Sequence, residues 1–126
     1  MSKKIIVAED SSVIQNLTKR ILTQQNYITT SVKNGAQVLE KLDKETYDMV
    51  LMDINMPIMD GVACAKEIRL RSKDKNGNIP IIAITGNANN YSKEDFKALG
   101  IDDYIPKPLN YDLLVETVKR HFEHGN

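Results

Sequence analysis

The chain has one cysteine, no net charge and no long apolar run. The single cysteine, Cys64, excludes an internal disulfide and leaves no thiolate cluster for a metal. Because 17 basic residues balance 17 acidic ones, no bulk charge attracts nucleic acid or an anionic membrane. No apolar run approaches the ~20 residues that cross a bilayer, and Met1 to Lys4 lack the apolar region of a secretory signal. We expect a cytoplasmic protein without direct contact to nucleic acid or membrane.

Length and composition predict one domain. The chain has 126 residues, of which 41% are apolar and 27% charged, as is ordinary for a globular protein. This length is close to the commonest domain size and leaves no room for a second core. No repeat or low-complexity segment divides the sequence. We expect a single domain over residues 1–126, with a core from about residue 4 to 123.

Short apolar runs alternate with amphipathic patterns five times along the chain. This alternation predicts an α/β fold, in which a parallel sheet with right-handed crossovers carries helices on both faces. Residues 72–78 are rich in turn-forming types and predict a loop. The expected strands cover about 4–8, 27–32, 48–53, 79–85 and 103–105, and the expected helices cover about 12–25, 62–71 and 92–100, with two more beginning near 35 and 111.

The first helix has an apolar stripe that we expect to face the core. Ser11 or Ser12 is a suitable N-cap for this helix. Its apolar residues recur at intervals of three and four, which place them on one side of a helix. They are Val13, Ile14, Leu17, Ile21 and Leu22.

Polar residues mark the ends of the later helices. Ser92 opens a Ser-Lys-Glu-Asp sequence that resembles a capping box. His121 and His124 lie near the C-terminus, where an exposed cationic ring favours the negative end of the helix dipole. We expect both histidines to be solvated.

Five polar residues follow directly after strand-like runs. Asp53 ends one run, Glu9 and Asp10 end another, and Thr85 and Lys107 end two more. Each alone is most simply a turn, cap or surface residue. Because the carboxyl ends of parallel strands share one edge of a sheet, the five together indicate a site there.

This set, in this order and at these intervals, resembles the receiver domain of two-component response regulators over nearly the whole chain. The resemblance implies a (βα)5 doubly wound, flavodoxin-like fold with strand order 2-1-3-4-5, an order that is known for receivers. Strands one and three would then be adjacent, about 4.8 Å apart, so Glu9, Asp10 and Asp53 would converge. Three carboxylates in contact repel one another unless a cation neutralises them.

The resemblance also implies a metal ion and its ligands. Hard oxygen donors suit Mg²⁺, which keeps several waters and often works on phosphate; Mn²⁺ is the alternative ion. Asp10 and Asp53 look like direct ligands, Glu9 like a water-mediated one, and the Asn55 backbone carbonyl like a further ligand.

By the same resemblance, Asp53 is the phosphoacceptor. Lys107 and Thr85 would bind the phosphoryl oxygens, and Tyr104 would rotate inward when Thr85 moves toward the phosphate. The surface of the fourth helix, fifth strand and fifth helix would then change for a partner. Receivers typically have a cis peptide at the position of Lys107-Pro108, and we expect one here.

The expected partners are proteins. A histidine kinase or histidine phosphotransfer protein would donate phosphate, docking on the first helix and the loop after strand five, and a downstream target would read the switch. We expect a monomer or a phosphorylation-dependent dimer that phosphorylates and dephosphorylates itself but is not an enzyme. The sequence leaves open whether the chain acts alone or belongs to a hybrid kinase.

Two other functions remain open from the sequence. One is a receiver-like binding module that works without phosphorylation, although such modules usually lack part of this residue set. The other is a phosphatase of the haloacid dehalogenase type, which also uses a strand-end aspartate, a Thr or Ser, a Lys and Mg²⁺. That family has a second acid two residues after the nucleophile, where this chain has Asn55. It also has an acid pair after the lysine, whereas in this chain Asp112 stands alone beyond Lys107.

Overall fold

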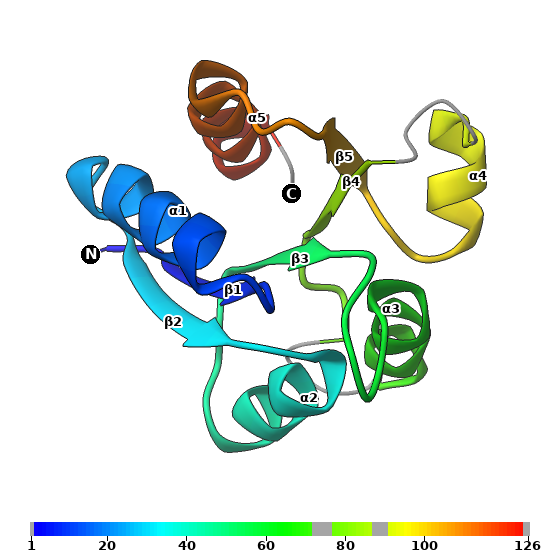
Figure 1. The fold of residues 1–126 in the computed structure, drawn as a ribbon. Helices are drawn as coiled ribbons and strands as arrows, with labels where there is room; N and C mark the ends of the chain where they lie inside the picture. The colour runs from blue at the N-terminus through cyan, green and yellow to red at the C-terminus, as the bar shows by residue number, and fades with distance from the viewer. Residues whose placement is uncertain (1, 72–76, 87–90, 125–126) are drawn as a thin grey trace.

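The computed structural model describes residues 2–71, 77–86 and 91–124 (Figure 1). Strands and helices alternate along the chain, as the sequence predicts, although most of the expected loop at 72–78 lies outside the described residues. No described helix is long and apolar enough to cross a membrane. The elements are β1 (Lys4–Ala8), α1 (Ser12–Gln24), β2 (Ile28–Val32), α2 (Gly35–Lys44), β3 (Met49–Asp53), α3 (Gly61–Leu70), β4 (Ile81–Thr85), α4 (Lys93–Ala98), β5 (Asp103–Pro106) and α5 (Tyr111–His124).

The five strands form one parallel sheet in the order β2-β1-β3-β4-β5, which confirms the predicted fold. β3 and β4 are buried along their whole length, as expected for parallel strands with helices on both sides. β4 starts at Ile81, two residues later than expected. Pro80, which lacks a backbone N–H, precedes it and only accepts a hydrogen bond, from Val50.

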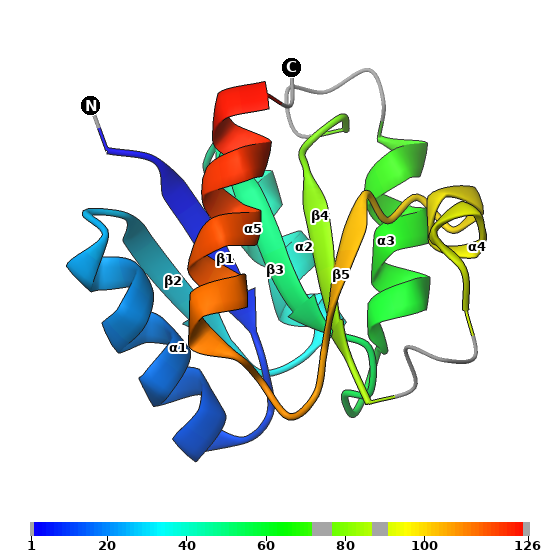
Figure 2. The ribbon, with the colours of Figure 1, turned by 90° about the horizontal axis from the view of Figure 1, so that it is seen from above.

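Helices cover both faces of the sheet (Figures 1 and 2). α1 and α5 pack on one face, where Leu22, Leu114 and Val118 join the inward residues of β1, β3, β4 and β5. α2, α3 and α4 complete the core on the other face. Figure 2 shows that β1 begins and α5 ends at the opposite edge of the sheet from the strands' carboxyl ends.

The buried face of α1 differs from the predicted apolar stripe. Val13 is 70% exposed and Leu17 39% exposed, whereas Gln15, Thr18 and Leu22 are buried. The Gln15 side-chain amide donates hydrogen bonds to the carbonyls of Glu9 (3.1 Å) and Val32 (2.6 Å), where β1 and β2 end. The stripe is thus confirmed at Leu22, and Ile21 also packs against the core, but Val13 and Leu17 lie outside the buried face. Carbonyls at strand ends need donors, and a polar residue of α1 supplies them.

Side-chain caps fix where the helices begin. Ser11 caps α1, Asn34 caps α2 and Asp60 caps α3, each by accepting a backbone N–H from the first turn. Ser92 caps α4 in a capping box with Asp95, which confirms the predicted pattern.

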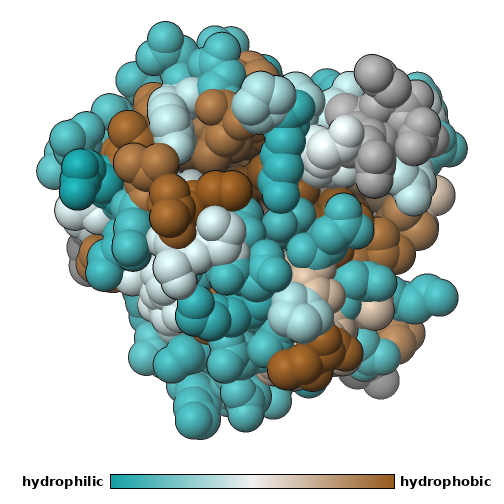
Figure 3. Space-filling view, in the orientation of Figure 1, coloured by the Kyte–Doolittle hydropathy of each residue, from teal (hydrophilic) through white to brown (hydrophobic). Residues whose placement is uncertain are grey.

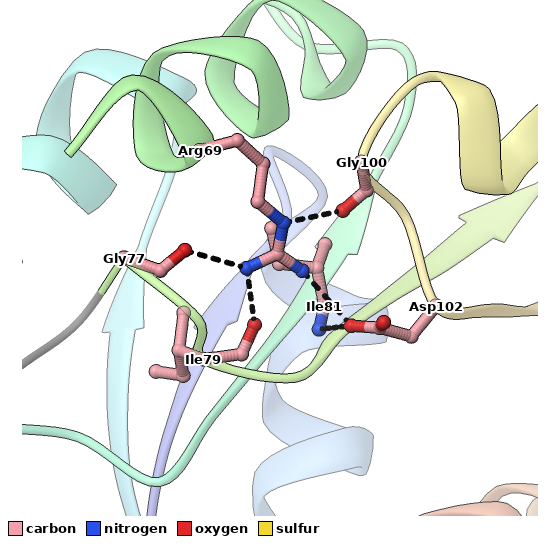
Figure 4. Close-up of polar contacts among 6 residues, drawn as sticks. All are labelled: Arg69, Gly77, Ile79, Ile81, Gly100 and Asp102. Carbon is pink, nitrogen blue, oxygen red and sulfur yellow. Dashed lines mark hydrogen bonds and ion pairs between the residues drawn. The ribbon is translucent and has the colours of Figure 1, made fainter. Parts of the chain in front are cut away.

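Arg69, on α3, ties together two connections that lie far apart in the sequence (Figure 4). Its guanidinium donates to the carbonyls of Gly77 (3.0 Å), Ile79 (2.7 Å) and Gly100 (2.9 Å), and pairs with the Asp102 carboxylate at 2.9 Å. The same Asp102 oxygen accepts the backbone N–H of Ile81 at 2.8 Å. One side chain thus fixes the chain before β4 and the chain before β5.

Candidate functional site

Three carboxylates meet at the carboxyl edge of the sheet. Ala8 of β1 lies in register with Met52 of β3, so the residues that follow them are neighbours. One oxygen each from Glu9, Asp10 and Asp53 lies within 4.8 Å of the others. Glu9 and Asp53 are buried and Asp10 is exposed. The strand order therefore brings together the three acids that the sequence singled out.

Asp53 lies buried at the end of β3 with both oxygens engaged. Its Oδ2 accepts from the Lys107 ammonium at 2.9 Å, and its Oδ1 accepts the backbone N–H of Asn55 at 3.1 Å. Gly61, the first residue of α3, lies against the backbone of Asp53. A Cβ at Gly61 would be only 2.7 Å from the Asp53 carbonyl oxygen. A glycine is therefore required for α3 to begin so near the backbone of Asp53.

Glu9 has one carboxyl oxygen without a partner. Its Oε2 accepts the backbone N–H of Ser11 at 3.0 Å, but its buried Oε1 has no hydrogen-bond partner. Burial raises the pKa of Glu9 to about 7, and the neighbouring charge of Asp53 adds to the rise. The orphaned oxygen and the all-oxygen donor set fit a hard divalent cation such as Mg²⁺. The backbone of Asn55, bound to Asp53, lies beside the same cluster.

Lys107 supplies the positive charge of the site. Burial opposes its charged form, yet the hydrogen bond and charge of Asp53, with the charges of Glu9 and Asp10, hold its pKa above the ordinary value. Its backbone N–H donates to the carbonyl of Thr85 at 2.9 Å. The Lys107-Pro108 peptide is cis, in agreement with the expectation.

Thr85 lies on β4, the strand next to that of Asp53, and Tyr104 lies on β5, one strand further out. Thr85 is buried at the end of β4, in register with Pro106 of β5. Tyr104, on β5, is half-buried, and its ring stacks on Phe96 of α4 with centroids 4.9 Å apart. β5 and α4 are thereby in direct contact through these two aromatic rings.

The prediction that His121 is solvated was wrong. Its side chain is only 19% exposed, and its Nε2 lies 2.8 Å from Oδ2 of Asp103, which is buried at the start of β5. Arg120 donates to the same oxygen at 2.7 Å. The sequence analysis did not predict this cluster. The one feature of the sequence that could have indicated it is an acidic residue, Asp103, at the start of an otherwise apolar strand.

Comparisons with known sequences agree with this geometry. The model of the response regulator receiver domain family matches residues 5–119. The hybrid signal transduction histidine kinase I of Dictyostelium discoideum is 40% identical over 121 residues, which are 92% of this chain and 7% of that protein. The DNA-binding transcriptional regulator NtrC of Escherichia coli is 36% identical over 94% of this chain and 24% of its own length. The chain thus spans less than a quarter of these relatives.

Solved structures show the same fold. The chemotaxis response regulator CheY4 of Vibrio cholerae has a TM-score of 0.85 at 28% identity, covering 95% of this chain and 98% of that one. The receiver domain of the sensor histidine kinase PA1611 of Pseudomonas aeruginosa, determined with magnesium coordinated in its active-site cleft, has a TM-score of 0.83 at 32% identity, with 95% and 97% covered. The chain belongs to the response regulator receiver domain family.

Proposed function

We propose that the protein accepts a phosphoryl group from a phosphohistidine on Asp53, with Mg²⁺ bound by the acidic cluster. Receiver domains are signalling modules of two-component systems rather than classical enzymes. The observation that carries the proposal is the convergence of Glu9, Asp10 and Asp53, with Asp53 bound to Lys107. We also propose that residues 1–126 form one domain that works in the cytoplasm.

The chemistry is the transfer of one group between two side chains. An Asp53 carboxylate oxygen attacks the phosphorus, the bond from phosphorus to the donor nitrogen breaks, and the histidine keeps the electron pair. Asp10, Asp53 and the Asn55 carbonyl would hold Mg²⁺ directly and Glu9 would hold it through water, with Mn²⁺ as a substitute. When bound, the ion supplies charge neutralisation for the transferring phosphoryl group. Lys107 would leave the Asp53 carboxylate and bind a phosphoryl oxygen.

The same contacts would switch the surface around α4, β5 and α5. A phosphoryl group adds about −1.5 to −2 charge, and Thr85 would turn its hydroxyl toward it. Tyr104 would then move into the space behind Thr85. Because its ring stacks on Phe96, a change at Tyr104 would reach α4. This surface would bind a downstream target protein.

The phosphodonor would be a histidine kinase or a histidine phosphotransfer protein that docks on α1 and the loop after β5. What supports this surface is the exposure of Val13 and Leu17 on α1. Figure 3 shows a hydrophobic area between α1 and α5 on a face that is otherwise mostly hydrophilic. The protein would act as a monomer or as a dimer that phosphorylation induces.

Intact-mass spectrometry after incubation with acetyl phosphate tests the proposal. We expect one added phosphoryl group that requires Mg²⁺ and is lost in Asp53→Asn. Asp60→Asn is the matched control, since it lies in the same loop and asparagine caps a helix as well as aspartate does. If no adduct forms even at the shortest times, phosphorylation of Asp53 is wrong; sustained turnover of a phosphomonoester would instead indicate a phosphatase.

A further inference from the structure

Ile58 has a backbone conformation that isoleucine rarely adopts. Among the described residues other than glycine, two have positive φ: Asn26 at 69° and Ile58 at 70°. Asparagine tolerates this left-handed region, whereas a β-branched side chain crowds its own backbone there. Ile58 is therefore strained at a position where asparagine or glycine would be relaxed.

The side chain of Ile58 contributes almost nothing to the core. It is 85% exposed, the largest exposure among the large apolar residues of the described chain. Its apolar neighbours in the same loop, Ile54, Met56 and Met59, pack against the core. In the isolated chain Ile58 thus combines backbone strain with an apolar side chain in water, and neither stabilises the fold.

The loop around Ile58 is held in place on both sides. Gly61 donates its backbone N–H to the carbonyl of Ile54 at 2.8 Å, and Gly35 donates to the carbonyl of Met59 at 2.9 Å. A Cβ at Gly35 would come within 2.8 Å of Met59, so α2 and this loop are in close contact. These contacts impose the conformation at Ile58 and fix where its side chain projects.

The position of Ile58 suggests what it contacts. The loop begins at Asp53, so Ile58 follows the phosphoacceptor by five residues at the same edge of the sheet. Val13, also exposed, follows Asp10 by three residues on α1. The acidic cluster therefore has an exposed aliphatic side chain in the chain that follows each of these two aspartates.

We propose that Ile58 is a docking and specificity residue for the protein that phosphorylates Asp53, inserting into an apolar surface beside the donor's phosphohistidine. This inference rests on the proposed function. An aliphatic side chain offers nothing to Mg²⁺ or to a phosphoryl group, so its partner is the apolar surface of a protein. Binding that surface recovers the hydrophobic free energy that exposure forgoes in the isolated chain.

The substitution Ile58→Asn separates docking from chemistry. Two phosphodonors are compared: acetyl phosphate, and a histidine phosphotransfer domain that is loaded by its kinase and phosphorylates the unaltered protein. We expect Mg²⁺-dependent labelling by acetyl phosphate to stay unchanged and the rate of transfer from the protein donor at subsaturating concentration to fall about tenfold. The melting temperature should stay equal or rise, because asparagine relieves the strain.

Two control variants make the comparison sharp. Leu70→Asn makes a similar exchange at a residue that is 74% exposed, but at the far end of α3, roughly 15 Å along the helix from Gly61. It should leave both rates unchanged. Ile58→Val keeps a β-branched aliphatic side chain and should retain most of the transfer rate.

The outcomes are distinguishable. Unchanged transfer from the protein donor to Ile58→Asn would overturn the docking role. An equal loss with both donors would also overturn it, because Ile58 would then act on the site itself. Absence of labelling of the unaltered protein by acetyl phosphate would instead contradict the proposed function.

Discussion

At the scale of the residue, Asp103 makes stability depend on pH. Burial opposes its charge, but hydrogen bonds from His121, the Tyr104 backbone and Arg120, with the charge of Lys93, hold its pKa below the ordinary value. A carboxyl group whose pKa is lower in the folded state stabilises the fold above its unfolded pKa, and this contribution is lost as pH falls through the folded value. We therefore expect the free energy of unfolding to fall less between about pH 7 and pH 3 in Asp103→Asn than in the unaltered protein. Urea unfolding at a series of pH values measures this difference.

Asp43→Asn is the control for this prediction, because Asp43 is an exposed aspartate that pairs with Arg71. Its free energy of unfolding should fall with decreasing pH as much as that of the unaltered protein. An equal fall for Asp103→Asn and the unaltered protein would contradict the role of Asp103.

The acids of the site could be predicted because each ends a recognisable strand. The partners of Asp103 could not, since His121 lies 18 residues away on another element and only the packing of α5 on the sheet brings the two together. The left-handed backbone at Ile58 was also beyond prediction, because the residue type argues against it.

At the scale of the element, Arg69 holds α3 to the segments before β4 and β5. We expect Arg69→Lys to lower the free energy of unfolding by roughly 1–3 kcal/mol, since an ammonium cannot reproduce the spread of a guanidinium over three carbonyls and a carboxylate. Chemical denaturation at neutral pH measures the difference.

Arg71→Lys is the matched control two residues further along. Arg71 pairs with an exposed carboxylate, Asp43, and exposed pairs contribute about 0–1 kcal/mol. Equal losses for the two variants would mean that the carbonyl contacts of Arg69 add nothing to stability.

The elements themselves were predictable to within about two residues, because apolar periods and caps such as Ser92 mark them. The orientation of α1 was not. Periodicity records where apolar residues recur, whereas the buried face of α1 is chosen partly by Gln15, which supplies donors to carbonyls that exist only once β1 and β2 are paired.

At the scale of the whole molecule, the acidic cluster should couple folding to Mg²⁺. An ion that binds only the folded chain stabilises it, by about 2.7 kcal/mol at a concentration of 100 times Kd. We expect the melting temperature to rise with Mg²⁺. Glu9→Gln should raise the metal-free stability by roughly 1 kcal/mol, because it removes a buried carboxyl group whose ionisation is opposed by burial and which has an unpartnered oxygen. It should also reduce the rise in melting temperature that Mg²⁺ causes.

Glu67→Gln removes an exposed acid on α3 and serves as the control. Mg²⁺ should raise its melting temperature as much as that of the unaltered protein. If Mg²⁺ raised the melting temperature of Glu9→Gln by the same amount, Glu9 would play no part in holding the ion. The strand order that assembles this site was implied by the family resemblance. It could not be predicted from the residue pattern, because five similar apolar runs do not determine which strands are neighbours in the sheet.

The contact between Lys107 and Asp53 joins residues that are 54 positions apart, and the other parts of the site come from β1 and β4. No contiguous stretch of the chain contains the site. A copy whose sheet is unfolded or incomplete therefore contains the aspartates but not the assembled site. Phosphorylation of Asp53, as proposed above, would therefore occur only on copies whose sheet is assembled.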